Sequence, residues 1–129
     1  SVRLCGPARS QMPQYVAMQS SPAPFIVLYR WKLQVGAEDT FVAAWSRLTE
    51  VLKARGSLGS RLHRGPDGIW YGYAQWSSAR ARQAAFAEDL DPAAAALMRS
   101  AIAESFPEIP LQVVADYLDA LSIAPVDEI

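Results

Sequence analysis

The turn at residues 65–68, with the sequence Gly-Pro-Asp-Gly, constrains this chain more than any other feature. Proline presets the φ angle that a tight turn needs, and glycine accepts a positive φ. Residues 57–64 and 69–76 on either side are expected to be strands, and a turn this short joins only antiparallel strands. The chain should therefore contain an antiparallel sheet that includes this hairpin.

The segment before the hairpin predicts a strand followed by a helix. Residues 25–33 are mostly aromatic, branched or long apolar residues, which favours a strand. The two-residue period of a strand puts these residues on one face: Phe25, Val27, Tyr29, Trp31 and Leu33. Residues 37–55 predict a helix that ends at Gly56. Its apolar positions form one buried stripe: Phe41, Ala44, Trp45, Leu48, Val51 and Leu52.

Two short helices and a last strand complete the pattern. The serine pair 77–78 is expected to cap one helix, and Asp91-Pro92 to begin the other. Residues 110–118 predict the last strand, and Pro110 marks it as an edge strand because proline donates no ladder hydrogen bond. The order β-α-β-β-α-β, with a split second helix, predicts an α+β fold of the ferredoxin-like type with an antiparallel sheet.

The predicted helices cover one face of this sheet and leave the other face partly apolar. That face includes Ile26, Leu28, Val114 and Leu118, or their alternates. Large apolar patches on a protein surface mark interfaces. Two copies packed face to face would bury this surface, so we expect a homodimer through the sheet face.

Composition narrows the classes of partner and site. The 129 residues carry a net charge of −1, so neither nucleic acid nor an anionic membrane is an expected partner. No apolar run approaches the roughly 20 residues of a membrane span. One cysteine and one histidine leave no set for a disulfide or a zinc site, which takes about four ligands. We expect no metal and a cytoplasmic location.

The chain divides into three predicted parts. Residues 1–24 contain four prolines and no periodicity, which is typical of a flexible arm that rests on the domain or on a partner subunit. Residues 25–118 form the ferredoxin-like domain. Residues 119–129 form an acidic tail.

Three segments within this domain resemble the antibiotic biosynthesis monooxygenase family. The first is Phe41-x-x-x-Trp45 on the predicted helix. The second is the glycine-rich stretch 56–64, Gly-Ser-Leu-Gly-Ser-x-Leu-x-Arg, and the third is Ala-Gln-Trp-Ser-Ser at 74–78. These residues mainly serve packing and turns. The resemblance implies a dimeric α+β barrel.

The resemblance also implies a range of activities. Some members oxidise polycyclic aromatic compounds with dioxygen and no metal, flavin or haem, others degrade haem, and others have no known activity. Haem-degrading members carry an Asn on strand one and a Trp and a His in the second helical region. The matching positions here are Tyr29, Ala85 or Phe86, and residues 93–97, which include no histidine.

We therefore expect a cofactor-independent oxygenase for an aromatic or polyketide-like molecule. Two alternatives stay open. One is a dimer that binds a small molecule without chemistry, and the other is a structural or interaction module.

Three tyrosines are the leading candidate site residues. By strand parity Tyr29, Tyr71 and Tyr73 would all face the helices and line one pocket with Trp45 and Phe86. A cofactor-free oxygenase needs an electron-rich substrate in a dry cavity and a polar group that handles its proton. We expect Tyr29 and Tyr73 to be catalytic and Tyr71 to bind substrate. The alternative is that these are core aromatics whose hydroxyls reach water.

Other residues complete the predicted set. His63 titrates near neutrality and is an acid–base candidate, with an exposed or dimer-facing position as the alternative. Trp31 and Met98 are expected to contact the substrate. Arg80 and Arg82 are interpreted as part of a solvated helix face.

Overall fold

The computed structural model describes residues 24–119, so the predicted arm and tail lie almost wholly outside the described residues. Within that range, the chain forms three helices and five strands. They are β1 (Phe25–Leu33), α2 (Glu38–Ala54), β2 (Gly59–Arg64), β3 (Trp70–Trp76), α3 (Ala79–Ala85), α4 (Pro92–Ala101), β4 (Ile102–Ser105) and β5 (Ile109–Gln112). No helix in this range is long and apolar enough to cross a membrane.

The strands form one antiparallel sheet in the order β2-β3-β1-β4, and β5 also pairs with β1. The hairpin sets the register of β2 against β3, with Leu62 opposite Gly72. β1 lies in the middle, with Tyr29 opposite Gly72 on β3. This order and the three helices between strands confirm the ferredoxin-like α+β fold.

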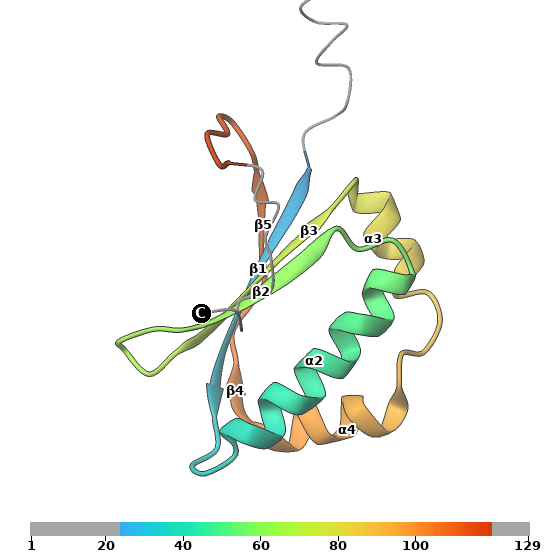
Figure 1. Ribbon diagram of the computed structural model, residues 1–129. Coiled ribbons are helices and arrows are strands. Elements are labelled where there is room, and N and C mark those ends of the chain that lie inside the picture. Colours follow the sequence, from blue (N-terminus) through green and yellow to red (C-terminus); the bar gives the residue numbers. More distant parts are fainter. Residues whose placement is uncertain (1–23, 120–129) are drawn as a thin grey trace, which may run out of the picture.

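All three described helices lie on one face of the sheet (Figure 1). The core between these layers centres on Phe41, which has no exposed surface. Its ring meets Trp31 edge-on at a centroid distance of 5.1 Å and Trp70 at 5.9 Å. Aromatic edge-to-face pairs stabilise a core beyond the apolar area they bury. The other face of the sheet carries no helix among the described residues.

Serine and aspartate begin the two short helices, as predicted. Ser78 Oγ accepts a hydrogen bond from the backbone N–H of Ala81 at 3.0 Å. Asp91 Oδ1 accepts one from the N–H of Ala94 at 3.1 Å, and Pro92 stands in the first turn of α4. Such caps satisfy backbone donors that have no partner inside the helix.

The prediction of a single last strand over residues 110–118 is wrong. The chain passes directly from α4 into β4, which pairs with the end of β1, and then into β5, which pairs with its beginning. Pro107 lies between β4 and β5, where it can donate no ladder hydrogen bond. Pro110 does lie on an edge strand, opposite Val27, and residues 113–119 form no strand.

Candidate active site

A cavity of about 140 Å³, partly open to solvent, lies between the sheet and the helices. β1, α2, β3 and the end of α3 each supply aromatic side chains to its wall. These side chains are Tyr29, Trp31, Trp45, Trp76 and Phe86. The aromatic side chains of β1 and β3 reach the cavity because they lie on the helix side of the sheet. Trp45 reaches it because the apolar stripe of α2 faces the sheet. The result is an aromatic wall on both layers.

The rest of the wall is almost entirely carbon. It consists of aliphatic side chains with two small hydroxyl residues: Leu48, Leu52, Leu90, Ala74, Met98, Thr49 and Ser60. A cavity of this size with apolar walls is large enough for an apolar molecule such as benzene. The cavity therefore suits an aromatic ring and not a charged ligand.

One ionic group lies where the cavity meets the surface. The Nη2 atom of Arg82 donates a hydrogen bond to the Tyr29 hydroxyl at 2.8 Å and to Glu108 Oε1 at 3.0 Å. The guanidinium also lies over two rings, 5.7 Å from the centroid of Tyr29 and 5.2 Å from that of Phe86. Tyr29 thus lines the cavity with its ring and meets a cation with its oxygen.

The two partners hold different charges at neutral pH. Burial raises the pKa of Tyr29, and this effect outweighs the nearby Arg82, which acts to lower it. For Arg82, burial acts to lower the pKa. The contacts with Tyr29 and Glu108 together outweigh burial, so the pKa of Arg82 is raised above its ordinary value. Tyr29 is therefore a neutral phenol and Arg82 a cation. Together they offer hydrogen-bond donors and positive charge to a developing oxyanion.

Tyr71 and Tyr73 do not line this cavity, which corrects the predicted grouping of three tyrosines. Paired residues of antiparallel strands point to the same side of a sheet. Tyr73 is paired with Leu28 and Tyr71 with Arg30, whereas Tyr29 is paired with Gly72. The two β3 tyrosines consequently point away from the helices.

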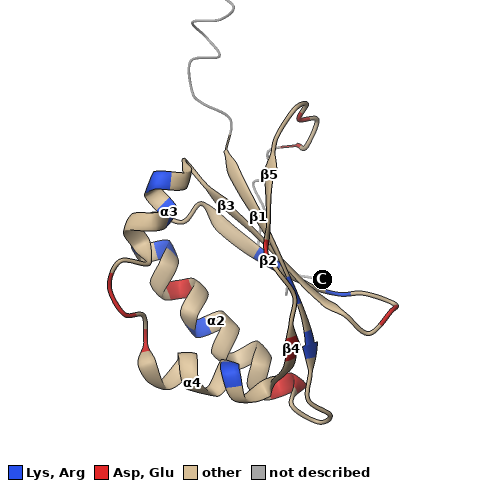
Figure 2. Ribbon diagram, turned by 180° about the vertical axis from the view of Figure 1, so that it is seen from behind, with Lys and Arg blue, Asp and Glu red and all other residues tan. Residues whose placement is uncertain are grey.

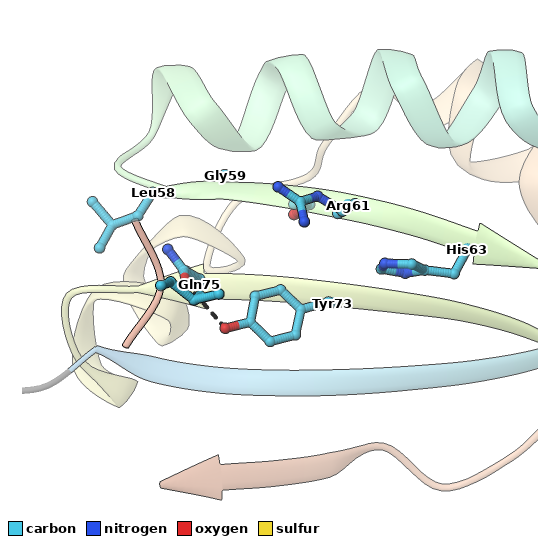
Figure 3. A pocket seen from close by; sticks show the side chains of 8 residues that line it. Leu58, Gly59, Arg61, His63, Tyr73 and Gln75 are labelled. Carbon is cyan, nitrogen blue, oxygen red and sulfur yellow. Dashed lines mark hydrogen bonds between the residues drawn. The ribbon is translucent and has the colours of Figure 1, made fainter. Parts of the chain in front are cut away.

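The face away from the helices has its own shallow groove of about 380 Å³ (Figure 3). Tyr73, His63 and Arg61 line it, and the Tyr73 hydroxyl donates to Gln75 Oε1 at 3.1 Å. His63 is exposed, as its alternative interpretation proposed. The sheet separates His63 from Tyr29, so the two cannot act on one ligand within a single chain.

The cavity thus brings together part of the predicted set. Tyr29, Trp31, Trp45, Phe86 and Met98 line it, and Tyr71, Tyr73 and His63 lie on the other face. Sequence reasoning missed Arg82, whose position on a short helix indicated a solvated face. Within residues 24–119 there is no group of three or more His, Cys, Asp or Glu side chains arranged to hold a metal ion.

One signal in the sequence pointed to the true face of β3. Gly72 lies in the strand interior, where glycine often marks close approach of another group. A Cβ at this position would lie 2.8 Å from Cη2 of Trp31. The glycine therefore makes room for a ring on the helix side, and the tyrosines on either side of it must face the opposite way.

Comparison with known proteins gives a consistent picture of the fold. No family model and no curated protein sequence matches the chain. The crystal structure of SnoaB, a cofactor-independent oxygenase from Streptomyces nogalater, aligns with a TM-score of 0.64 and 17% identity, over 75% of this chain and 99% of that one. A Caulobacter crescentus CB15 protein, provisionally assigned as an antibiotic biosynthesis monooxygenase, aligns with a TM-score of 0.63 and 22% identity, over 74% and 93%. The chain therefore has the fold of the antibiotic biosynthesis monooxygenase structures, as its sequence motifs implied.

Proposed function

We propose that this protein is a cofactor-independent oxygenase that acts on an aromatic small molecule in the helix-side cavity. The observation that carries the proposal is the position of the Tyr29–Arg82 pair beside an apolar, aromatic-lined cavity. The fold shared with SnoaB supports the same class of reaction.

In this oxidation the protein would mainly bind the substrate and stabilise the negative charge that develops on it. A phenol or its keto form loses a proton to solvent at the open side of the cavity and becomes an electron-rich anion, which reacts with dioxygen, and the proton returns in the water that is formed. For a methylene carbon the overall change is one CH₂ and one O₂ to one C=O and one H₂O. The Tyr29 hydroxyl and the Arg82 guanidinium would stabilise the oxyanion, while apolar walls exclude water. No role for His63 is needed.

Oxygen uptake with a panel of hydroquinones and anthrones tests the reaction. We expect at least one compound to consume one O₂ for each carbonyl product formed, at a rate proportional to protein concentration. The rate should be unchanged when a metal chelator is added. Heat-denatured protein at the same concentration is the control, because these compounds also oxidise slowly in air. Uptake no faster than in this control across the whole panel would refute the oxygenase.

A binding function without chemistry is the second candidate. The almost wholly apolar cavity favours it, because Tyr29 and Glu108 already satisfy two of the donors of Arg82. Calorimetry under nitrogen separates the two functions. A ligand that binds with micromolar affinity but is never oxidised when air is admitted identifies a binding protein.

We also propose that the sheet face away from the helices pairs with a second copy. Large apolar side chains are exposed around this face: Leu58, Leu111, Val114, Tyr117 and Leu118. Ile26, on the same face, is buried beside a groove lined by residues 111–118, so the chain covers part of the face itself. The remaining apolar surface is of the kind that dimers bury. Among residues 24–119, no helix lies on this side of the sheet (Figure 2).

Light scattering at micromolar concentration tests the dimer. We expect twice the mass of the 14.1 kDa chain. Leu118→Asp should shift the protein toward the monomer, because a carboxylate in an apolar interface loses its hydration. Leu97→Asp is the matched control, since Leu97 is comparably exposed but lies on α4, on the helix side. A monomeric wild-type protein would exclude this pairing.

A further inference from the structure

We infer that the cavity selects a one-ring phenol or hydroquinone, and that Phe86 is the residue that sets this limit. The inference rests on the proposed site and narrows its substrate class. It depends on three observations. They are the volume of the cavity, the position of Phe86 between two spaces, and the hydrogen bond between Arg82 and the cavity-lining Tyr29.

The volume sets the size of the ligand. A cavity of about 150 Å³ with apolar walls accommodates benzene, and the present cavity has about 140 Å³. Pockets for ligands of drug size have roughly 300–1,000 Å³. A second fused ring would have to push aside Trp31, Trp45 or Trp76, whose rings are held between the sheet and α2. The cavity as it stands therefore holds one ring.

Phe86 separates this cavity from a second space. An open depression of about 680 Å³ lies outside it, lined by Phe25, Ala79, Arg82, Gln83, Phe86 and Ala87. Phe86 is the one residue that lines both spaces. On the inside, the centroid of its ring lies 6.1 Å from the ring centroid of Trp76. On the outside, it lies 5.2 Å from Cζ of the Arg82 guanidinium. With 42% of its surface exposed, Phe86 stands between the two spaces as a partition and is not part of the core.

The ionic group gives the ligand its orientation. Arg82 lines the outer depression, and the Tyr29 hydroxyl that it binds belongs to a ring lining the inner cavity. A phenol whose ring enters the cavity would therefore direct its oxygen toward the Tyr29–Arg82 pair. A ligand without such an oxygen would displace water from the Tyr29 hydroxyl and offer its proton no acceptor, which costs affinity.

Calorimetry under nitrogen with phenol, 1-naphthol and 9-anthrol measures the ring limit without turnover. For the wild-type protein we expect phenol to bind at least about tenfold more tightly than 1-naphthol, a discrimination typical of a pocket with no spare volume. In Phe86→Ala the cavity and the depression join. The preference should shift toward 1-naphthol by about tenfold or more.

Phe106→Ala is the matched control, because it removes the same ring from a position against Arg30, away from the cavity. It should leave the preference unchanged. Wild-type protein that binds 9-anthrol as tightly as phenol, or that binds no phenol, overturns the inference. So does a Phe86→Ala protein, folded by circular dichroism, whose preference equals that of wild type. If the ring limit holds but no oxygen is consumed, the inference stands and the oxygenase proposal fails.

Discussion

Replacement of Arg82 by methionine should lower kcat for the oxidised substrate by about 10²-fold or more, with a small effect on substrate affinity. Removal of one donor to a developing oxyanion typically costs about 10²–10³ in turnover. Methionine keeps most of the apolar stem that lies against Tyr29 and Phe86, but it removes the guanidinium that donates to the Tyr29 hydroxyl. The effect should therefore fall on the chemical step. Steady-state oxygen uptake over a range of substrate concentrations measures both constants.

Arg80→Met is the matched control for this prediction. Arg80 lies two residues earlier on α3 and is exposed, so its replacement should leave kcat within about twofold of wild type. Arg82→Lys keeps the charge without the planar fork and should retain part of the activity. Equal turnover by Arg82→Met and wild type would show that the cation does not act on the reaction.

The pH dependence of turnover reports on Tyr29 as the second donor. Because burial raises its pKa above the ordinary value of about 10, the hydroxyl stays protonated over the neutral range. Turnover should lose this donor only when the pH rises above about 10. Tyr29→Phe keeps the ring, so the alkaline loss should vanish together with much of kcat.

Replacement of Phe41 by alanine should lower the free energy of unfolding by about 3–5 kcal/mol, the range for a fully buried aromatic residue. Phe41 has 0% exposure, and its ring supports Trp31 and Trp70 on the sheet. Total stability in a domain of this size is about 5–15 kcal/mol, so the variant should be close to the limit of folding. Urea unfolding followed by tryptophan fluorescence measures the change.

Val42→Ala is the control for that loss, because Val42 is the next residue on α2 and is 39% exposed. It should change stability by no more than about 0.5 kcal/mol. Both variants must be compared at the same protein concentration, because dimer formation would add to the apparent stability. A loss below about 1 kcal/mol for Phe41→Ala would mean that the core closes around the gap.

Part of the fold was predictable because it depends on interactions between near neighbours in the chain. The Gly65–Gly68 turn, the caps at Ser78 and Asp91, and the apolar stripe of α2 all involve residues within a few positions of one another. The end of the chain was harder to predict. Residues 110–118 contain enough apolar residues for a strand, but the free edge of the sheet is that of β1. β4 pairs with the end of β1 and β5 with its beginning, so no single long strand forms there.

The sequence by itself determined the order of the elements as far as α4, the antiparallel hairpin and the aromatic richness of the core. Only the tertiary structure decided which tyrosine belongs to the cavity. A two-residue period divides each strand into two faces, but the register between strands decides which faces coincide. Here Trp31 packs over Gly72 and fixes that register, so Tyr29 faces the helices while Tyr71 and Tyr73 face away. The contact between Arg82 and Tyr29 spans 53 positions and needs the packing of α3 on the sheet, which no local pattern contains.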